Sequence, residues 1–275
     1  MTGTVDVDAY FRRIGYEGPG NPDLDTLQSL QRRHALAIAF ENLDPLLRRP
    51  VRLDPQSLAD KLLRAGRGGY CFEQNRLLST VLTELGFRVT DLAARVVWNA
   101  PEGAVRPRSH MLLRIDLEEG PFLADVGFGG LTLTEPLRLV VDLEQPTSHE
   151  PFRLLRTGED FMMQALVRGT WTSLYRFDLQ PQLLPDYEVA NWYVSTHPES
   201  IFLNCLMAAL PTPDGRLALL NGELTHYRLG RDPHKRTLRD SRELRRVLTE
   251  SFGITLPEDP GLDAVLARMV AQRYA

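Results

Sequence analysis

Apolar positions in the first third of the chain follow a mixed but mostly helical spacing. From Asp23 to Phe40 this spacing predicts one helix. A second helix is expected to start at Asp54 or Ser57, either of which can cap it, and to run through Leu63. It should stop before Gly66, so the first third of the chain reads as helical.

A third helix is predicted from Tyr70 to Leu85, directly after the break Arg67-Gly68-Gly69. Its apolar side chains have the spacing of a single helix face, at Leu77, Leu78, Val81, Leu82 and Leu85. Gly86 is well placed to end this helix. Cys71 therefore falls in the first turn.

After Gly86 the pattern changes to short runs rich in apolar and β-branched residues. Strands are predicted at 89–98, 110–117, 122–126, 137–143, 152–156, 161–167 and 170–177. Beyond Pro185 we expect a helix at 199–210, strands at 217–220 and 224–229, and terminal helices at 241–252 and 262–272. Helices, then strands of a barrel or sandwich, then a mixed end are typical of the α+β class.

Composition narrows the class of protein without changing this picture. The 275 residues include 32 Lys+Arg and 36 Asp+Glu, which gives a formal net charge of -4. An isoelectric point of about 5.9 argues against a nucleic-acid partner. No stretch approaches the roughly 20 apolar residues that span a bilayer, and the first residues lack the apolar run of a signal peptide. We expect a cytoplasmic protein with reduced thiols and no membrane partner, and the sequence leaves the oligomeric state open.

The two cysteines are too few for a disulfide framework, so a thiol is available as a nucleophile. Cys71 lies where helix N–H groups and the macrodipole stabilise a negative charge, and the preceding glycines permit close approach. The alternative is that Cys71 is a small buried hydrophobe. Cys205 has apolar neighbours and no visible activator, which favours a structural role.

A nucleophilic cysteine needs a base, and the base needs a group that orients it. His110, at the start of a predicted strand, is the best placed of the six histidines, although a structural histidine is the alternative. Asp125 lies in an apolar strand and should have a partner there, because burying a lone carboxylate is costly. A symmetric hairpin centred on Glu119-Gly120 would pair Asp125 near Arg114, leaving His110 roughly 13 Å away. The two side chains then meet only through an asymmetric turn, a bulge, or a different pairing of the strands.

The glycines that follow Asp125 do not form a known phosphate-binding motif. No Gly-Lys-Ser/Thr follows them, and the spacing of a dinucleotide fingerprint is missing. The sequence also lacks the Cys-x-x-Cys and His-Glu-x-x-His patterns of common zinc sites, so we expect no metal.

Together, these motifs resemble those of the arylamine N-acetyltransferase family. The matching segments are Arg67-Gly68-Gly69-Tyr70-Cys71-Phe72-Glu73-Gln74-Asn75, Ser109-His110, Asp125-Val126-Gly127-Phe128-Gly129, Phe40-Glu41-Asn42-Leu43 and Asn191-Trp192-Tyr193-Val194-Ser195. The family often has proline where Ala39 stands here. The resemblance implies an N-terminal helical bundle with the catalytic cysteine, a central β-barrel with the histidine and aspartate, and a C-terminal α/β lid with a terminal helix. We place these parts at 1–87, 88–190 and 191–275.

The resemblance also implies a chemistry and its residues. Cys71, His110 and Asp125 would form a catalytic triad that takes an acetyl group from acetyl-CoA as an acetyl-cysteine and passes it, by a ping-pong scheme, to an aromatic amine or hydrazine. No tightly bound cofactor is implied, since acetyl-CoA is a co-substrate. The implied acceptor-binding residues are aromatic: Phe40, Tyr70, Phe128 and Phe202. The implied CoA contacts are Ser109, Gly129, Gly130 and Lys235.

Two other functions stay open on the sequence alone. A thiol hydrolase or a transglutaminase-like enzyme can use the same order of Cys, His and Asp, with water or a protein amine as the acceptor. A non-catalytic small-molecule binding protein on this scaffold would be expected to have lost a triad residue, and all three are present. A redox role has little support because no second cysteine lies near Cys71 in the sequence.

Overall fold

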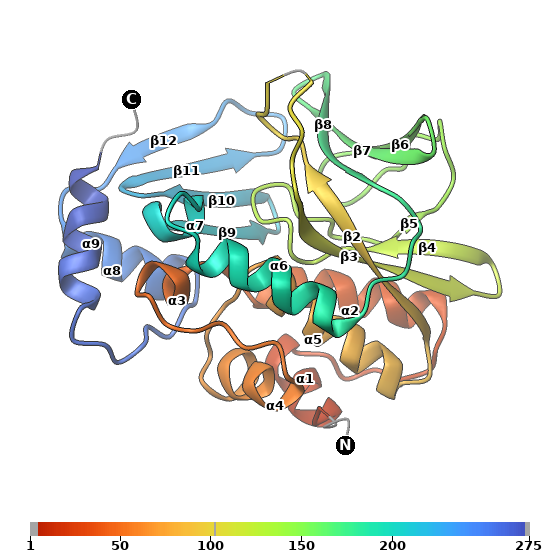
Figure 1. Ribbon diagram of the computed structural model, residues 1–275, viewed down its shortest axis with the longest axis horizontal. Helices are drawn as coiled ribbons and strands as arrows, with labels where there is room; N and C mark the ends of the chain where they lie inside the picture. The colour runs from red at the N-terminus through yellow and green to blue at the C-terminus, as the bar shows by residue number, and fades with distance from the viewer. Residues whose placement is uncertain (1–4, 102, 273–275) are drawn as a thin grey trace.

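The computed structural model describes residues 5–101 and 103–272, and it gathers the early helices into one layer (Figure 1). These helices are α1 (Val7–Ile14), α2 (Leu24–Ala37), α3 (Leu43–Leu46), α4 (Pro55–Leu58), the π-helix η1 (Ala59–Arg64) and α5 (Cys71–Glu84). Asp6, Asp23 and Asp54 cap α1, α2 and α4, each accepting a backbone N–H from the first turn. The predicted helices at 23–40, 54–63 and 70–85 are thus confirmed, with two differences: the first ends at Ala37, so that Phe40 lies in a strand, and the second continues as η1.

The middle of the chain forms a seven-stranded antiparallel sheet in the order β5-β4-β3-β2-β8-β7-β6. Its strands are β2 (Arg88–Val96), β3 (Arg108–Leu117), β4 (Gly120–Ala124), β5 (Leu137–Arg138), β6 (Phe152–Thr157), β7 (Asp160–Val167) and β8 (Thr170–Phe177). The chain after β5 bridges to β6 at Val141–Leu154 and Gln145–Phe152, and the Gln145 side chain also bonds the backbone of Arg138. These links join the two edge strands and nearly close the sheet into a barrel.

The predicted strand at 137–143 is wrong beyond its first two residues. Only Leu137–Arg138 is a strand. The chain then turns, with Asp142 at a left-handed φ of 58°. The turn moves the backbone from the β4 side of the barrel to the β6 side, which a straight strand could not do.

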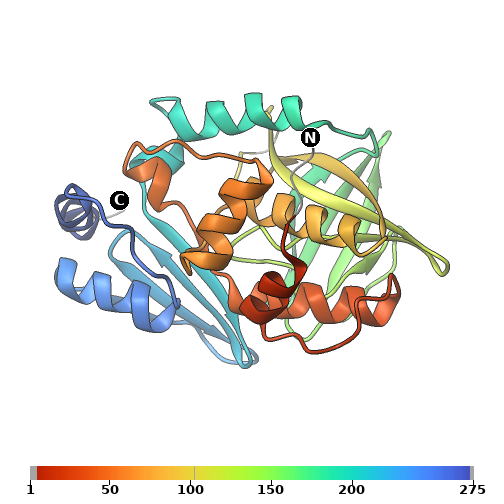
Figure 2. The ribbon, with the colours of Figure 1, turned by 90° about the horizontal axis from the view of Figure 1, so that it is seen from below.

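A second sheet, in the order β1-β9-β10-β11-β12, is completed from distant parts of the chain. Its strands are β1 (Phe40–Glu41), β9 (Met207–Thr212), β10 (Gly215–Leu220), β11 (Glu223–Arg228) and β12 (His234–Thr237). One face is covered by α8 (Ser241–Arg246), the π-helix η2 (Val247–Ser251) and α9 (Leu262–Ala271), with which it shares a hydrophobic core. Seen from below, the N-terminal helices lie in front of the two sheets (Figure 2).

The predicted helix at 199–210 is also wrong over most of its length. A short helix, α7 (Ile201–Asn204), gives way to strand β9. The Asn42 side chain donates to the carbonyls of Phe202 and Cys205 and accepts from the N–H of Met207, at 2.7–2.8 Å. These bonds hold the backbone in an extended form after α7 ends at Asn204, and they align it beside β1.

Helix α6 (Leu184–Thr196) crosses the molecule and was not predicted, because its apolar residues do not form one helix face. It connects the barrel to α7 and β9 (Figure 1). The predicted boundary between 190 and 191 lies inside this helix, and the division into 1–87, 88–190 and 191–275 stays a prediction. Within the described ranges, no helix is long and apolar enough to cross a membrane.

Candidate active site

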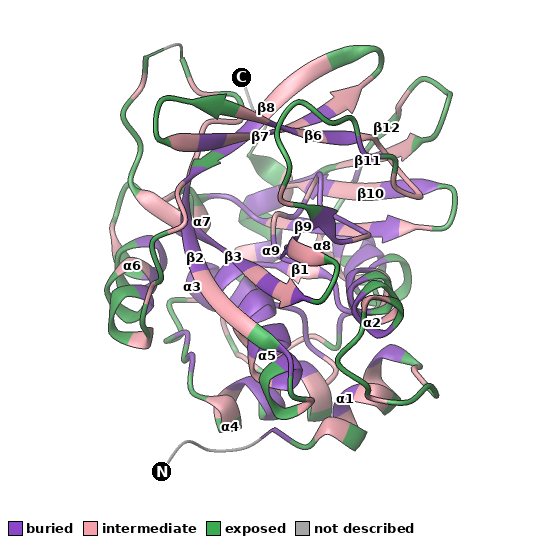
Figure 3. Cartoon of the chain, turned by 90° about the vertical axis from the view of Figure 1, so that its right-hand side faces the viewer, coloured by how far each residue is buried: buried purple, intermediate pink, exposed green. Residues whose placement is uncertain are grey.

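Cys71 is the first residue of α5 and is buried. Helix α5 packs against strands β2 and β3 of the barrel (Figure 3). The helix start is fixed by Glu73, whose carboxylate accepts the backbone N–H of Tyr70 at 3.1 Å. The Cys71 Sγ lies 3.6 Å from the carbonyl oxygen of Ser109. The thiol therefore occupies the end of α5 where helix N–H groups favour a negative charge.

Two glycines near the start of α5 have no room for a side chain. A Cβ atom on Gly127 would lie 2.7 Å from Cys71 Cα, so this glycine lets the backbone after Asp125 pack directly against the cysteine. A Cβ atom on Gly68 would lie 2.2 Å from the carbonyl oxygen of Ala39, so this glycine lets the segment before Cys71 pack against the chain that precedes β1.

His110 and Asp125 meet in the structure. The His110 Nε2 atom lies 2.7 Å from Asp125 Oδ2, and both residues are buried, at 2% and 0% exposure. The second carboxylate oxygen accepts from the Asn75 side-chain amide and from the Gly127 N–H, each at 2.9 Å. Asp125 is thus held by three donors and presents one oxygen to the imidazole.

The register of the hairpin explains how these two residues meet. Leu117 pairs with Gly120, so the turn is Glu118-Glu119 and not the Glu119-Gly120 centre considered from the sequence. This register extends to place Asp125 beside Leu112, only two residues from His110. A bulge also shifts β3 against β2 next to His110.

Burial alone would lower the pKa of His110, but the charge and hydrogen bond of Asp125, together with the nearby Cys71 sulfur, raise it to about 10. Burial would raise the pKa of Asp125, yet His110, Asn75 and the Gly127 N–H hold it below its usual value. Because Asp125 engages Nε2, Nδ1 is the ring nitrogen that is left for the thiol. The imidazole is therefore in its charged form at neutral pH.

Aromatic rings form two groups around these residues. Phe40, Tyr70 and Phe202 lie together, with ring centroids of Phe202 at 6.4 Å from Phe40 and 5.3 Å from Tyr70. Phe128 lies on the histidine side, 5.3 Å from the His110 ring. Within the first group, Tyr70 is fully buried and its hydroxyl donates to the Asn191 side chain.

The sequence-predicted CoA contacts fall into two places. Ser109 adjoins Cys71 and His110, Gly129 has its Cα against the Phe40 ring, and Gly130 lies against the Trp98 ring. Lys235 lies far from these three, on the exposed edge strand β12 of the second sheet.

Sequence reasoning missed Asn75, Trp98 and Tyr175 as parts of this site. The Asn75 side chain bonds Asp125, the Val126 N–H and the Met111 carbonyl, and its position one helix turn after Cys71 was a signal that could have identified it. Tyr175 lies with its ring 4.9 Å from His110, and Trp98 lies 5.7 Å from Phe128. Both come from distant strands or loops, so no local pattern marks them.

A buried thiol at a helix start, a charged imidazole and an oriented carboxylate are the components of nucleophilic cysteine catalysis. Over the part of the chain that the structure describes, no group of three or more His, Cys, Asp or Glu residues could hold a metal ion.

Comparison with known proteins gives one consistent result. A family model described as N-acetyltransferase matches residues 23–260. An arylamine N-acetyltransferase from Mycobacterium tuberculosis is 46% identical over 275 residues, covering 96% of this chain and 97% of the relative. One from Escherichia coli is 46% identical over 246 residues, covering 89% and 87%. The solved structure of Mycobacterium marinum arylamine N-acetyltransferase in complex with CoA has a TM-score of 0.93 and 43% identity, over 96% of this chain and 99% of that one.

Proposed function

The chain belongs to the arylamine N-acetyltransferase family, and we propose that it transfers acetyl groups from acetyl-CoA to aromatic amines or hydrazines through an acetyl-Cys71 intermediate. The observation that carries this proposal is the His110–Asp125 hydrogen bond of 2.7 Å beside the cysteine that begins α5. The charged imidazole next to the thiol supports a preformed thiolate–imidazolium pair.

In the first half-reaction the Cys71 thiolate attacks the thioester carbonyl carbon of acetyl-CoA. A new carbon–sulfur bond forms to Cys71, and the bond to the CoA sulfur breaks. The imidazolium of His110 gives its proton to the departing CoA thiolate, which leaves His110 neutral. Backbone N–H groups at the start of α5 stabilise the oxyanion that forms on the way.

In the second half-reaction the amine nitrogen attacks the acetyl carbon. Neutral His110 takes a proton from that nitrogen, and the Cys71 sulfur departs as a thiolate, so the ion pair is restored. Asp125 keeps the ring in position and stabilises its charge in both halves. Asn75 acts through Asp125 and is therefore a positioning residue.

The aromatic side chains supply the slot for the acceptor. We assign Phe40, Phe202 and Phe128 to this slot, because the first two rings lie together and the third lies against His110, and we assign Tyr70 to it through its contact with Phe202. We assign Ser109, whose carbonyl oxygen lies 3.6 Å from the Cys71 sulfur, and with it Gly129 and Gly130, to the acetyl-pantetheine part of CoA, and Lys235 to its far end. The reduced thiol that this scheme requires fits a cytoplasmic location.

Steady-state kinetics tests this function. Initial rates are measured while acetyl-CoA and an arylamine such as 4-aminobenzoate are varied together. A ping-pong mechanism predicts parallel lines in double-reciprocal plots. It also predicts no activity in Cys71→Ala. Intersecting lines would contradict the acetyl-enzyme, and CoA release at the same rate with or without the amine would favour the thiol hydrolase instead.

A further inference from the structure

Three buried polar side chains link the helical layer to the loop that precedes Cys71. The Tyr10 hydroxyl, from α1, lies 3.0 Å from Nδ1 of His34, in α2, and Nε2 of His34 lies 2.7 Å from Oε1 of Gln74, in α5. Each of the three residues has an exposed fraction of 0%. We call Tyr10, His34 and Gln74 the polar relay. The proposed mechanism uses none of them.

The amide of Gln74 fixes the direction of the hydrogen bonds in the relay. Its NH₂ group faces three backbone carbonyl oxygens at 2.9–3.2 Å, those of Ile38, Ala39 and Gly69. Because the NH₂ group donates there, Oε1 accepts from His34, and His34 must carry its proton on Nε2. Burial keeps the ring neutral by lowering the pKa of His34 to about 4, so Nδ1 accepts from the Tyr10 hydroxyl.

The far end of the relay holds two segments of backbone side by side. A parallel β-bridge joins Phe40 to Gly69, and the Gly69 N–H donates to the Ala39 carbonyl at 3.3 Å. Gln74 donates to the carbonyls of Ala39 and Gly69, one on each segment. Since Gln74 lies three residues after Cys71 in α5, its side chain ties both segments to the helix that carries the nucleophile.

Hydrogen bonds hold this loop in place, because Gly68 and Gly69 bring no side chains to it. A Cβ atom on Gly69 would lie 2.8 Å from a carboxylate oxygen of Glu73. The loop is thus packed too closely for side chains of its own to fasten it. The NH₂ group of Gln74 supplies that fastening, and the rest of the relay fixes the Gln74 side chain in turn.

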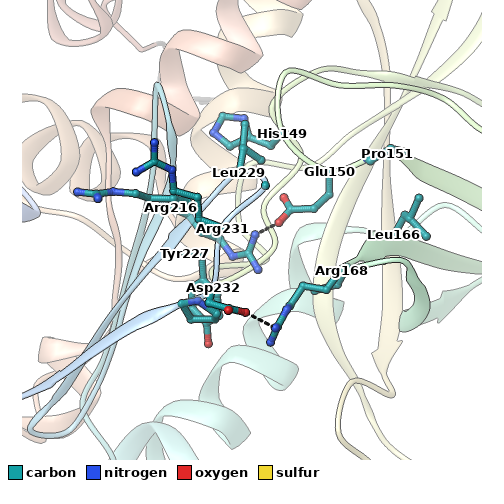
Figure 4. A pocket seen from close by; sticks show the side chains of 14 residues that line it. His149, Glu150, Pro151, Leu166, Arg168, Arg216, Tyr227, Leu229, Arg231 and Asp232 are labelled. Atoms are coloured by element: carbon teal, nitrogen blue, oxygen red, sulfur yellow. Dashed lines mark hydrogen bonds and ion pairs between the residues drawn. The ribbon is translucent and has the colours of Figure 1, made fainter.

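Breaking the relay is more costly than breaking a polar contact at the surface. In the cavity between the barrel and the second sheet, Arg168 pairs with Asp232, with side-chain exposures of 64% and 87% (Figure 4). Water takes the place of either partner when such a pair opens, so the pair contributes little. In the relay, at 0% exposure, a lost bond leaves a buried donor or acceptor unsatisfied. Each member of the relay is therefore held by the next.

Phe40 and Cys71 have different tasks in the proposed function. Cys71 takes part in both half-reactions, whereas Phe40 is assigned to the acceptor slot and serves only the second. The carboxylate of Asp125, which holds His110, is fixed by the Asn75 side chain at 2.9 Å. Loosening the relay would therefore move Phe40 relative to the Cys71 sulfur and leave the triad in place.

We propose that the polar relay positions the acceptor site, by holding the segment that carries Phe40 in a fixed place beside Cys71. Tyr10 and His34 act through Gln74 and are positioning residues. This role rests on the proposed function, since it belongs to the second half-reaction. In a ping-pong scheme, kcat/KM for each substrate reports on the half-reaction of that substrate. The relay should therefore matter more to kcat/KM for the arylamine than to kcat/KM for acetyl-CoA.

Gln74→Met is the test variant, because methionine keeps the length of the side chain and removes its hydrogen bonds. The carbonyls of Ala39 and Gly69 each keep a backbone donor, so we expect the chain to fold. Gln31→Met is the matched control, since Gln31 is also 0% exposed and donates its amide to the Leu133 carbonyl at 3.2 Å. Initial rates are measured with acetyl-CoA and 4-aminobenzoate.

We expect Gln74→Met to lower kcat/KM for 4-aminobenzoate about tenfold and kcat/KM for acetyl-CoA by less than about twofold. The N–H groups of Gly69 and Glu41 should exchange with solvent faster in this variant than in the control. Gln31→Met should lose stability too, but its two kcat/KM values should stay in their native ratio. If Gln74→Met does not fold, Tyr10→Phe takes its place: it removes one hydroxyl and should lower kcat/KM for the amine about threefold, with acetyl-CoA unaffected.

An equal fall of both kcat/KM values in Gln74→Met, unchanged values in a folded relay variant, or the same selective loss in Gln31→Met would overturn this role. Formation of the acetyl adduct at Cys71 by the native chain is measured by intact mass. A native chain that forms the adduct, with variants that show no selective loss, retains the proposed function and loses only the role of the relay. A native chain that forms no adduct overturns the proposed function, and the role falls with it, so the adduct tells the two failures apart.

Discussion

At the residue scale, the proposed mechanism depends on the charge of His110. The imidazole is buried, yet Asp125 and the Cys71 sulfur keep it protonated. Asp125 is itself fixed by Asn75 and the Gly127 N–H, so it cannot turn away from the ring. A charged imidazole beside the sulfur is what the proposed mechanism requires of this residue.

We predict that His110 titrates with a midpoint at about 10, well above the usual 6.5. The measurement is the pH dependence of its ¹⁵N ring shifts by NMR. Because folding raises this pKa, the charged ring stabilises the fold fully below about 6.5, and this contribution is lost as the pH rises through about 10. In Asp125→Asn the midpoint should fall toward the usual value.

His34 is the internal control for this titration. Burial lowers its pKa to about 4, although a hydrogen bond to Gln74 opposes the shift. It should therefore stay neutral across the range in which His110 changes. A His110 ring that is already neutral at pH 8 would contradict the preformed ion pair.

At the element scale, a buried ion cluster holds the start of α5. Lys61, from η1, lies 2.6 Å from Glu73 and 2.7 Å from Asp44. Arg67 lies 2.7 Å from Glu41 and 3.1 Å from Asp44. Glu73 in turn caps the helix at Tyr70. The position of the nucleophile thus depends on charges that come from the preceding helix and loop.

We predict that Lys61→Met destabilises the fold by about 3 kcal/mol, because it leaves Glu73 without its cation and Asp44 with one fewer. The free energy of unfolding is measured with denaturant at neutral pH. Arg64→Met, in the same π-helix, removes an exposed ion pair with Asp60 and should leave the midpoint nearly unchanged. Equal effects of the two substitutions would show that the buried cluster does not support α5.

The elements that could be predicted from sequence are those with strong local signals. Apolar spacing marked α2 and α5, a capping residue at Asp54 or Ser57 marked α4, and runs of apolar and β-branched residues marked β2, β3 and β6–β8. Helix α6 has no single apolar face, so its sequence carries no helical signal. Strand β9 lies in a segment with helical spacing, but hydrogen bonds from the Asn42 side chain, about 160 residues earlier, hold it in the extended form. Long-range contacts of this kind leave no trace in a local pattern.

The same limit applies to the site. The sequence singled out each residue separately: Cys71 by its place at a helix start, His110 by its place at a strand start, and Asp125 as a carboxylate in an apolar run. His110 and Asp125 come together because the turn is Glu118-Glu119 and because a bulge lies beside His110. Moving the turn by one residue would change which residues of β3 and β4 face each other. Tyr175 reaches His110 from β8 only because β8 pairs with β2.

At the scale of the whole molecule, the site lies where three parts of the chain meet. The helical layer supplies the thiol, the barrel supplies the imidazole and the carboxylate, and the segment from α6 to β9 supplies Phe202. Asn191 of α6 fastens that segment by bonds to the Tyr70 hydroxyl and to the Val51 carbonyl. The proposed acyl transfer through Cys71 therefore requires the assembled fold.

The central claim is tested most directly by the intact mass of the protein after incubation with acetyl-CoA and no acceptor. The account predicts a mass gain of one acetyl group, its absence in Cys71→Ala, its retention in Cys205→Ala, and its loss when an arylamine is added. Failure of the folded chain to gain the acetyl group or release CoA, or an adduct that persists in Cys71→Ala, would contradict it.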